Sequence, residues 1–252
     1  MNGGEIGVEK IKLVKKKEYP QLKKLHESFD ISEDSEVCLA VGGDGTFLEA
    51  AREFKGPILP IRGGEKDSLG FHADFTVEDI DEIISELKQN SYTVEEYSKL
   101  KITCKGRVYN AVNDVVLFRA SPKSVHCKVY YWENGERKPL FPKDLKGDGV
   151  VFSGQIGSTA YNFFAGGPII HRADVIIVTP LSANYNTSIV SEGEFCVEVT
   201  KSEGSIEYDG FTLGRLVKGE DFTVGKSTEK IKVIHLRPRE SFSEKLVRLH
   251  LF

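Results

Sequence analysis

The sequence predicts an α/β N-terminal domain built on a Rossmann-like parallel sheet, followed by a β-rich C-terminal domain. Before residue 95, apolar runs typical of buried strands alternate with apolar residues at helical spacing, which places helices against a parallel sheet. After residue 95, helical spacing almost disappears and apolar residues alternate with polar ones, as in antiparallel strands. We therefore expect an α/β domain over residues 1–95, a β-rich domain over 96–236, and a tail, 237–252, that packs back on the first domain.

Strands and helices of the first domain are expected in regular alternation. Apolar runs predict strands at residues 11–14, 37–41 and 58–61. Apolar residues recur at helical spacing in three segments: Leu22, Leu25 and Phe29; Phe47, Ala50, Ala51 and Phe54; Ile80, Ile83, Ile84 and Leu87. Thr76 and Asp79, three residues apart, resemble a capping box at the start of the last helix.

The second domain is expected to be mainly antiparallel. The predicted strands are residues 100–104, 108–118, 125–132, 195–199 and 231–235. Asn134-Gly135 is a strong hairpin signal. The apolar run 150–152 interrupts this pattern because it enters a glycine-rich turn and then a short predicted helix over 158–165.

The composition is that of an ordinary globular protein, with 252 residues, of which 40% are hydrophobic and 29% charged. The net charge of −4 disfavours nucleic acid as a partner, since nucleic-acid binding favours a basic face. No apolar stretch is long enough for a bilayer, and the first ten residues lack the apolar block of a signal peptide. The four cysteines have no Cys-x-x-Cys spacing, which indicates neither a disulfide framework nor a zinc site. We expect a cytoplasmic protein without nucleic-acid or membrane partners.

A glycine turn separates the predicted strand 37–41 from the helix that follows. Gly42, Gly43, Gly45 and Thr46 leave backbone N–H groups at the positive end of that helix, where phosphates bind. Asp44 sits inside the turn, where a carboxylate suits a group that holds a metal ion or receives a proton. This combination predicts kinase-like chemistry without a P-loop, although Asp44 is equally able to cap the helix.

Asn113 and Asp114 interrupt an otherwise apolar run. Burying unsatisfied polar groups costs about 1–3 kcal/mol each, so the pair implies a ligand or a strong internal partner. A β-bulge or a strand end at this point would explain the pair equally well.

Two further segments are rich in small residues. Before the strand 150–152, Asp148 is placed to accept hydrogen bonds from ribose or amide groups. After it, Gly157 to Tyr161 offers small residues that let a planar ring approach the backbone, and Tyr161 to stack on the ring. The alternative is a glycine-rich hairpin with a capped helix.

Other motifs carry less information. Gly225-Lys226-Ser227 resembles the end of a P-loop, but its spacing to Gly219 is one residue too long and no helix is predicted after it. Residues 15–17, three lysines, are expected to form a solvated turn. The six histidines show no ligand spacing, so none of them is predicted to bind a metal ion, and no protein side chain other than Asp44 is a candidate metal ligand.

Taken together and in this order, the segments resemble the NAD kinase family, which phosphorylates NAD to NADP with ATP or polyphosphate. The resemblance runs from about Val37 to the C-terminus. Its strongest stretch covers residues 147–170, and further support comes from Leu69-Gly70-Phe71, Tyr208-Asp209-Gly210 and Arg237-Pro238. The chain departs from the family at Gly154-Gln155-Ile156, at Phe164, at Phe211 and at Arg62-Gly63-Gly64.

The resemblance implies an NAD-kinase-like fold with NAD between its domains, assembled as a homodimer or homotetramer. By matching position, Asp44 is the catalytic aspartate that acts on the 2′-hydroxyl of the adenosine ribose. Other positions match residues that contact NAD: Gly45, Phe71 near adenine, Asn113 and Asp114 on adenine and ribose, Thr159, Ala160 and Tyr161 in the adenosine pocket, Lys146 and Asp148 at the nicotinamide end, and Phe164 and Ser182. We expect Mg²⁺ or another divalent cation as cofactor, with NAD and a phosphoryl donor, ATP or polyphosphate, as substrates.

Two alternatives stay open at this stage. A lipid or sugar kinase would share the glycine-aspartate turn but not the Asn113-Asp114 pair or the Gly157 to Tyr161 segment. A non-catalytic dinucleotide sensor is favoured by Phe164 and by the changed turn at residues 154–156. It would bind NAD without transferring phosphate.

Overall fold

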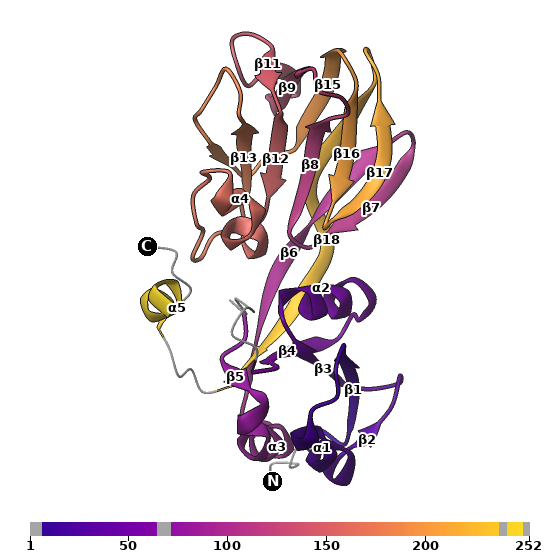
Figure 1. Cartoon of the computed structure of the whole chain (residues 1–252), viewed down its shortest axis with the longest axis vertical. Helices are drawn as coiled ribbons and strands as arrows, with labels where there is room; N and C mark the ends of the chain where they lie inside the picture. Colours follow the sequence, from indigo (N-terminus) through magenta and orange to yellow (C-terminus); the bar gives the residue numbers. More distant parts are fainter. Residues whose placement is uncertain (1–6, 65–71, 237–240, 249–252) are drawn as a thin grey trace. The chain divides into compact units, whose positions relative to one another are not determined.

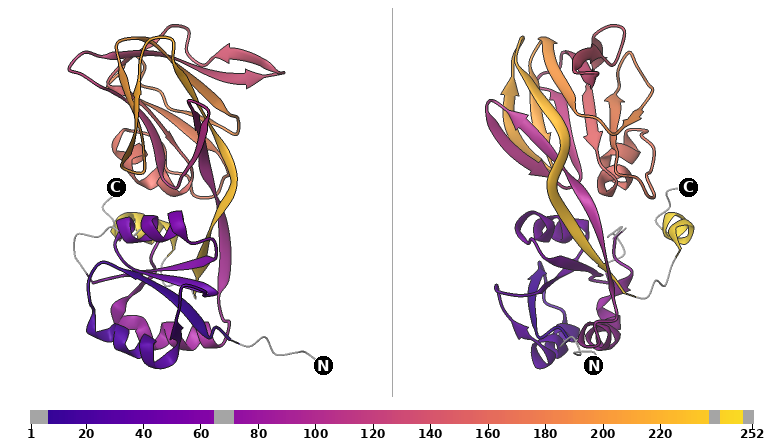
Figure 2. Two further views of the ribbon diagram at one scale, coloured as in Figure 1. Left: turned by 90° about the vertical axis from the view of Figure 1, so that its right-hand side faces the viewer. Right: turned by 180° about the vertical axis from the view of Figure 1, so that it is seen from behind.

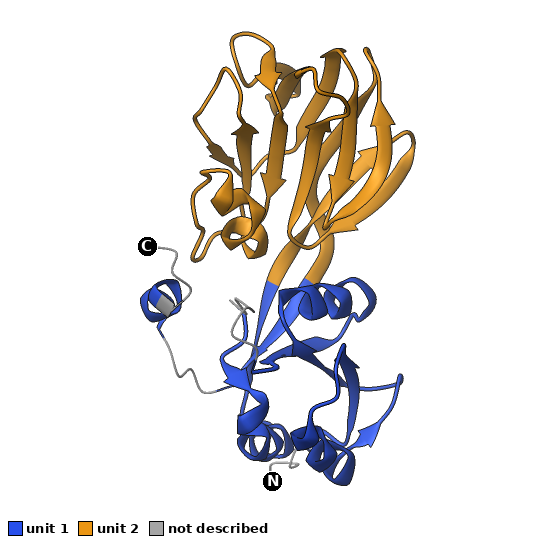
Figure 3. Ribbon diagram, in the orientation of Figure 1, with its two compact units in different colours: residues 1–96, 231–252 blue, residues 97–230 orange. Residues whose placement is uncertain are grey.

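The computed structural model describes residues 7–64, 72–236 and 241–248. The chain divides into two compact units (Figure 3): residues 1–96 with 231–252, and residues 97–230. Two long strands, β6 and β18, each begin in one unit and end in the other.

The first unit is built on a parallel sheet (Figure 1). Its strands are β1 (Lys10–Lys15), β2 (Asp30–Ile31), β3 (Val37–Gly42), β4 (Pro57–Arg62), β5 (Phe75–Thr76) and the last part of β18 (Asp221–His235). They follow the order β18-β4-β3-β1-β2, with β5 also on β4. All of these pairings are parallel, as the alternation of strands and helices predicts.

Helices cover this sheet on both faces. The helical segments are η1 (Pro20–Leu22), α1 (Lys23–Ser28), α2 (Asp44–Glu53), η2 (Val77–Asp79), α3 (Ile80–Lys88) and α5 (Phe242–Arg248). Figure 2 shows α2 on one face of the sheet, with α1 and α3 on the other. The α3 helix buries Ile80, Ile83 and Leu87, and the predicted capping box of Thr76 and Asp79 is present. The structure thus confirms the predicted α/β architecture.

The second unit contains two antiparallel sheets. The first comprises β6 (Thr93–Cys104), β7 (Arg107–Ala111), β9 (Val125–Glu133), β10 (Glu136–Pro139), β11 (Leu145–Gly147), β15 (Phe195–Lys201) and the first part of β18. The second comprises β14 (Ile189–Ser191), β13 (Ile176–Leu181), β12 (Gly149–Ser153), β8 (Asp114–Arg119), β16 (Gly204–Tyr208) and β17 (Phe211–Leu216), in that spatial order. Two short helices, η3 (Ile156–Thr159) and α4 (Tyr161–Phe164), follow β12.

Alternation along the strands of the second sheet explains how this unit is layered. On β8, Val115 and Leu117 join the core shared with the first sheet. The intervening Val116 packs on the opposite face with Val151, Leu181 and Ala165. Successive side chains of a strand face opposite sides, so one face forms the core of a β-sandwich. The other face carries the segment that follows β12.

In the second unit, the structure confirms the predicted hairpin and corrects one predicted strand and one predicted helix. The hairpin at Asn134-Gly135 is confirmed: both residues have positive φ, 53° and 78°, as a type I′ turn requires. The predicted strand 108–118 is wrong, because it is two strands, β7 and β8, in different sheets. The predicted helix 158–165 is instead a 3-10 turn followed by the four residues of α4. The P-loop-like residues 225–227 lie inside strand β18.

The C-terminal helix α5 belongs to the first unit. Its Lys245 forms an ion pair with Asp74, and Leu246 is buried. Asp74 is also 3.7 Å from the Nδ1 atom of His235. Burial works to raise the pKa of Asp74, but hydrogen bonding to His235 and Lys245 outweighs it and holds that pKa below its usual value. None of the helices in the described part of the chain has the length and apolar character needed to cross a bilayer.

Candidate active site

The glycine turn of the first unit lies where a phosphate-binding turn is expected. Strand β3 ends at Gly42, and α2 begins at Asp44, with Gly43 as an N-cap that offers no side chain. A Cβ on Gly42 would stand 2.4 Å from Thr46 Oγ1, and its φ of +154° is unusual for other residues. The tight turn therefore needs glycine. No side chain caps the start of α2. Asp44 is half-buried at the first helical position, where a negative charge is favourable.

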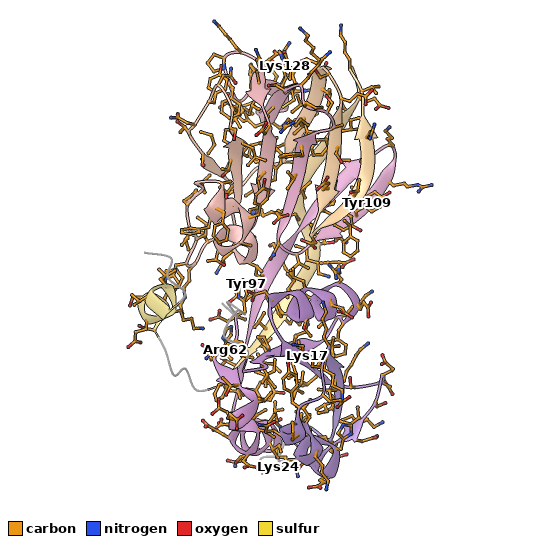
Figure 4. The ribbon with its side chains drawn as sticks, in the orientation of Figure 1. Lys17, Lys24, Arg62, Tyr97, Tyr109 and Lys128 are labelled. Atoms are coloured by element: carbon orange, nitrogen blue, oxygen red, sulfur yellow. The ribbon has the colours of Figure 1, made fainter. Side chains whose placement is uncertain are left out.

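Cationic side chains surround the carboxyl edge of the parallel sheet. Lys16 and Lys17 follow β1, and Arg62 ends β4 beside Gly42; Lys17 and Arg62 are labelled in Figure 4. The Lys16 Nζ atom lies 3.7 Å from where a Cβ on Gly45 would stand. Lys16 and Lys17 are exposed in a bend, as the predicted solvated turn requires, whereas Lys15 is the last residue of β1. The ammonium group of Lys16 also lies close to the glycine turn.

The Asn113-Asp114 pair lies at one end of the second sheet of the second unit. Asp114 starts β8, opposite Ser153 at the end of β12, so the strand-end interpretation of the pair is correct. The Asp114 carboxylate is 8% exposed. Within the described residues, neither it nor the Asn113 side-chain amide has a hydrogen-bond partner. Both groups are therefore available to a polar ligand.

Asp209 holds the backbone of this pair. Its Oδ2 atom accepts a hydrogen bond from the Val112 amide at 2.8 Å. Its Oδ1 atom accepts from the Asn113 amide at 2.8 Å and from the Asp114 amide at 3.3 Å. Val112 and Asn113 lie between β7 and β8, outside both strands, and buried amides without an acceptor are costly. Burial and the nearby Asp209 charge raise the pKa of Asp114 to about 7.

Replacing Asp114 by asparagine is expected to raise the melting temperature at about pH 8. The folded pKa lies above the ordinary value of ~3.9, so the unfolded chain ionises first and stability falls as pH rises from about 4 to about 7. The variant lacks this ionisation, so the difference in melting temperature between variant and wild type shrinks as the pH approaches about 4. Thermal denaturation at several pH values measures this difference. A difference that does not change with pH would contradict this explanation.

The segment after β12 approaches Asn113 at Gly157. A Cβ on Gly157 would stand 1.9 Å from the Asn113 carbonyl oxygen and 2.6 Å from Ser153 Oγ. The Ser153 hydroxyl itself donates to that carbonyl at 3.1 Å. Only glycine permits this approach, which brings the Asn113-Asp114 pair and the start of η3 together.

A buried hydrogen-bond network fixes the rest of this segment. The Asn162 amide donates to the carbonyls of Ser158 and Pro168 at 3.2 and 3.0 Å. Its oxygen accepts from the Thr179 hydroxyl at 2.7 Å, and that hydroxyl lies 3.0 Å from Ser188 Oγ. Because Asn162 is fully buried and satisfied, the network holds η3 and α4 rigidly on β13.

The exposed residues of the segment are aromatic. Tyr161 is 41% exposed and Phe164 is 70% exposed, whereas Thr159 is buried. Burial raises the pKa of Tyr161, and the carboxylates of Asp114, Asp148 and Glu207 raise it further. Tyr161 thus lies within electrostatic reach of both carboxylates predicted to bind ligand. Ala160, between the two short helices, is half-buried.

Lys146, Asp148 and Ser182 lie at the opposite end of β12 from Asp114. The Asp148 carboxylate accepts from Arg119 Nε at 2.7 Å, and its amide donates to the Leu181 carbonyl at 2.9 Å. Lys146 and Ser182 are both exposed, and Ser182 has a φ of +42°. The second unit therefore brings together the predicted adenosine-binding residues at one end and this second group at the other.

A surface cavity of about 630 Å³ borders this second group. It is lined by Lys146 and Asn184, together with residues of β9 and of the segment 139–144 at and after the end of β10. The adenosine-binding candidates are not among its lining residues, so the cavity does not mark the predicted adenosine pocket.

Two predictions concern metal ions and adenine. Among the residues that the structure describes, no three histidine, cysteine, aspartate or glutamate side chains gather closely enough to hold a metal ion. Phe71, the residue predicted to lie near adenine, falls outside the described residues.

Two known protein-family domains match most of this chain. Residues 8–92 match the ATP-NAD kinase N-terminal domain, and residues 112–236 match the ATP-NAD kinase C-terminal domain. The chain belongs to the NAD kinase family. It is therefore an enzyme with NAD kinase function, a phosphotransferase, and the resemblance predicted from the glycine-rich segments is confirmed.

Related NAD kinases match most of the chain. The NAD kinase of Acetivibrio thermocellus is 32% identical over 228 residues, which cover 84% of this chain and 76% of the relative. That of Sulfurimonas denitrificans is 31% identical over 215 residues, 81% of this chain and 74% of the relative.

Solved structures show the same fold. An NAD kinase from Archaeoglobus fulgidus in complex with ATP aligns with a TM-score of 0.75 at 18% identity, over 96% of this chain and 98% of that chain. A yeast NADH kinase complexed with NADH aligns with a TM-score of 0.79 at 18% identity, over 97% and 87%. The NAD-kinase-like fold class predicted from sequence is confirmed.

Three residues of the site do not stand out in the sequence. Asp209 reads as an ordinary Asp-Gly hairpin turn, Asn162 as a helix residue and Arg119 as the end of a strand. Their roles depend on contacts across 17 to 97 positions of sequence. Only the position of Asp209 beside glycine, within the family motif Tyr208-Asp209-Gly210, offered a signal.

Proposed function

We propose that this protein transfers the terminal phosphoryl group of ATP to the 2′-hydroxyl of the adenosine ribose of NAD, giving NADP. The observation that carries the proposal is the position of Asp44, at the start of α2 and directly after a glycine turn at the carboxyl edge of a parallel sheet. The matched family models name ATP in their descriptions, and the Archaeoglobus structure contains ATP. Both support ATP over polyphosphate as the donor.

Asp44 would act on the attacking hydroxyl. Carboxylates are weak bases at neutral pH, so its main contribution is to orient the 2′-hydroxyl and to receive its proton as the new bond forms. The amides of Gly42, Gly43 and Gly45 would bind the phosphate groups of the substrates. Thr46 would contribute its hydroxyl group, because its amide donates to the Gly43 carbonyl at 3.0 Å. Phosphoryl transfer depends chiefly on such positioning and on charge compensation.

The second unit would supply the adenosine-binding residues. The Asn113 amide and the Asp114 carboxyl group would bind adenine and ribose, since both lack partners among the described residues. Thr159, Ala160 and Tyr161 would line the adenosine pocket, with Tyr161 stacking on the base. The remaining proposed contacts to NAD are Gly45, Phe71, Lys146, Asp148, Phe164 and Ser182.

A divalent cation fits this arrangement with little help from side chains. Mg²⁺ keeps several waters and binds through one or two carboxylates plus substrate phosphates, which agrees with a turn that carries a single carboxylate, Asp44. When bound with ATP, the ion would neutralise charge on the phosphoryl group. Asp44 is the residue that would hold it.

Replacing Lys16 by glutamine is expected to raise the KM for ATP about tenfold, because one charge-assisted hydrogen bond to phosphate is worth about 1.5–3 kcal/mol. The KM for NAD should stay near the wild-type value. Lys15→Gln is the matched control, since the Lys15 ammonium pairs with Glu18 instead. Steady-state kinetics with each substrate varied measures both constants; equal KM values for ATP in the two variants would remove Lys16 from the site.

We also propose a cytoplasmic homodimer or homotetramer. Lys146 and Asp148 lie at the opposite end of β12 from Asp114. A second copy of the chain could present an equivalent pair to the nicotinamide end of the dinucleotide.

One assay tests the proposed function directly. The purified protein is incubated with Mg²⁺, NAD and either ATP or polyphosphate, and NADP is separated and quantified. NADP formation with ATP supports the proposal, and the parallel reaction with polyphosphate identifies the donor. NAD binding without NADP formation would show a dinucleotide sensor, and phosphate transfer only to a lipid or sugar would show a different kinase.

A further inference from the structure

The Asp209-Gly210 turn joins β16 to β17, and its backbone and the Asp209 side chain have separate roles. Both residues have positive φ, 46° and 81°, which is the geometry of a two-residue type I′ hairpin turn. The backbone alone makes that turn, and Asn-Gly or Gly-Gly would serve it equally well. The hairpin therefore does not explain what the Asp209 carboxylate does.

The Asp209 carboxylate is occupied by the backbone of a remote segment. Three amides, those of Val112, Asn113 and Asp114, donate to it at 2.8, 2.8 and 3.3 Å. The Asp209 amide returns a hydrogen bond to the Asp114 carbonyl at 3.2 Å. Four hydrogen bonds thus tie this turn to the segment that enters β8.

The neighbouring contacts hold the turn itself in place. Tyr208 packs against Tyr109 and Phe211, with ring centroids 6.0 and 5.9 Å apart, and Tyr208 pairs with Val115 in the sheet. From the opposite side, Gly157 and Ser153 contact the Asn113 carbonyl. The Asn113 backbone is therefore fixed on its amide side by Asp209 and on its carbonyl side by the segment after β12.

We propose that Asp209 is a positioning residue, which holds Asn113 and Asp114 in the geometry that binds the adenosine part of NAD. The inference rests on the proposed function for the identity of the ligand. It does not require Asp209 to touch the dinucleotide, because both of its oxygens are already used by backbone amides.

The Asp209 charge also contributes to the ionisation behaviour of Asp114. Burial is the larger cause of the raised pKa of Asp114, and the Asp209 charge adds to it. Tyr161 is also electrostatically coupled to Asp114. With its pKa at about 7, Asp114 is partly protonated at neutral pH and can donate a hydrogen bond as well as accept one. Removing the Asp209 charge should make Asp114 ionise at lower pH.

Two substitutions test the role, with a matched control. Asp209→Ala removes all acceptors, and Asp209→Asn keeps one oxygen while removing the charge. Glu220→Gln is the control, because Glu220 also accepts a backbone amide at a turn, that of Val217 at 2.9 Å, but does not contact the Asn113 segment. Calorimetry measures NAD affinity, kinetics separate the KM values of NAD and ATP, and thermal denaturation reports stability.

Asp209→Ala is expected to weaken NAD binding about tenfold or more, the effect of one misplaced polar pair, with the KM for ATP within about twofold of wild type. Glu220→Gln should change neither constant. A folded Asp209→Ala protein that binds NAD like wild type would overturn the proposal.

The ionisation of Asp114 gives a readout that needs no substrate. Carbon-detected NMR of the unliganded protein should show the Asp114 carboxyl group titrating at lower pH in Asp209→Asn than in wild type. An unchanged midpoint in a folded Asp209→Asn protein would overturn the electrostatic role. The titration does not depend on NADP formation. If the wild-type protein makes no NADP, the proposed function fails, and the titration still tests the role of Asp209.

Discussion

Replacing Asp44 by asparagine is expected to lower kcat for NADP formation by about 100-fold to 10,000-fold, the range typical of losing a positioned proton acceptor. Asparagine has nearly the same size and can still accept a hydrogen bond, but it lacks the charge that, in the proposed mechanism, orients the attacking hydroxyl and receives its proton. Substrate affinity should change much less than kcat, because the glycine-turn amides that we propose as phosphate ligands remain. Steady-state NADP formation measures the effect.

Stability must be separated from chemistry in this variant. Asp44 is also the acidic residue in the first turn of α2, and losing such a charge costs about 0.3–1 kcal/mol. Asp81→Asn is a suitable control, because Asp81 lies in the first turn of α3 and is remote from the glycine turn in sequence. Its exposed ion pair with Lys24 is also lost, but exposed pairs of this kind contribute little to stability. Both variants should show similar small decreases in melting temperature, and only Asp44→Asn should lose activity. An Asp44→Asn enzyme with near wild-type kcat would exclude this residue from the reaction.

Replacing Gly157 by alanine is expected to produce the second large effect. The new methyl group would stand 1.9 Å from the Asn113 carbonyl oxygen and 2.5 Å from its carbonyl carbon, so the Asn113 backbone must move. Overpacking of this kind costs about 1–3 kcal/mol of stability. Because Asn113 and Asp114 move with the backbone, NAD affinity should fall at least about tenfold.

Gly154 provides the matched control on the same loop. An alanine Cβ there would meet Ser98 and Leu100 at 3.8 and 3.9 Å, which is ordinary van der Waals contact. Gly154→Ala should therefore keep NAD affinity and melting temperature close to wild type. Calorimetric titration with NAD, below the melting temperature of both variants, compares them. Equal affinities for Gly157→Ala and Gly154→Ala would show that the close approach to Asn113 is unimportant for binding.

The local parts of the fold are predictable from the sequence because their causes are local. The apolar run of β3, the helical spacing of α2 and the capping box before α3 each lie within a few residues. The Asn134-Gly135 hairpin is equally local, since its two residues accept positive φ.

The division of residues 108–118 into two strands has a remote cause. Asn113 and Asp114 interrupt the apolar pattern, but the residues on both sides favour strand, so propensity alone predicts one strand. The break at Val112 and Asn113 is stabilised by Asp209, about a hundred residues later, and by Gly157. The sequence of the segment itself does not predict these remote contacts.

The site shows the same division between local and remote causes. Asp44 and its glycines can be found in the sequence because the predicted phosphate-binding turn is made by adjacent residues. Lys16 cannot be told apart from its two lysine neighbours in the sequence. Its position near Gly45 follows from the parallel pairing of β1 with β3. Asn162 looks like any polar residue of a helix, and its partner Thr179 belongs to a strand seventeen residues away.

A crystal structure of the enzyme with bound NAD tests the central claim most directly. The distance to measure joins the Asp44 carboxylate to the 2′-oxygen of the adenosine ribose. We predict hydrogen-bond contact, about 2.6–3.2 Å, with the adenine ring beside Asn113 and Tyr161. An adenosine ribose bound out of reach of Asp44 would contradict the proposed mechanism.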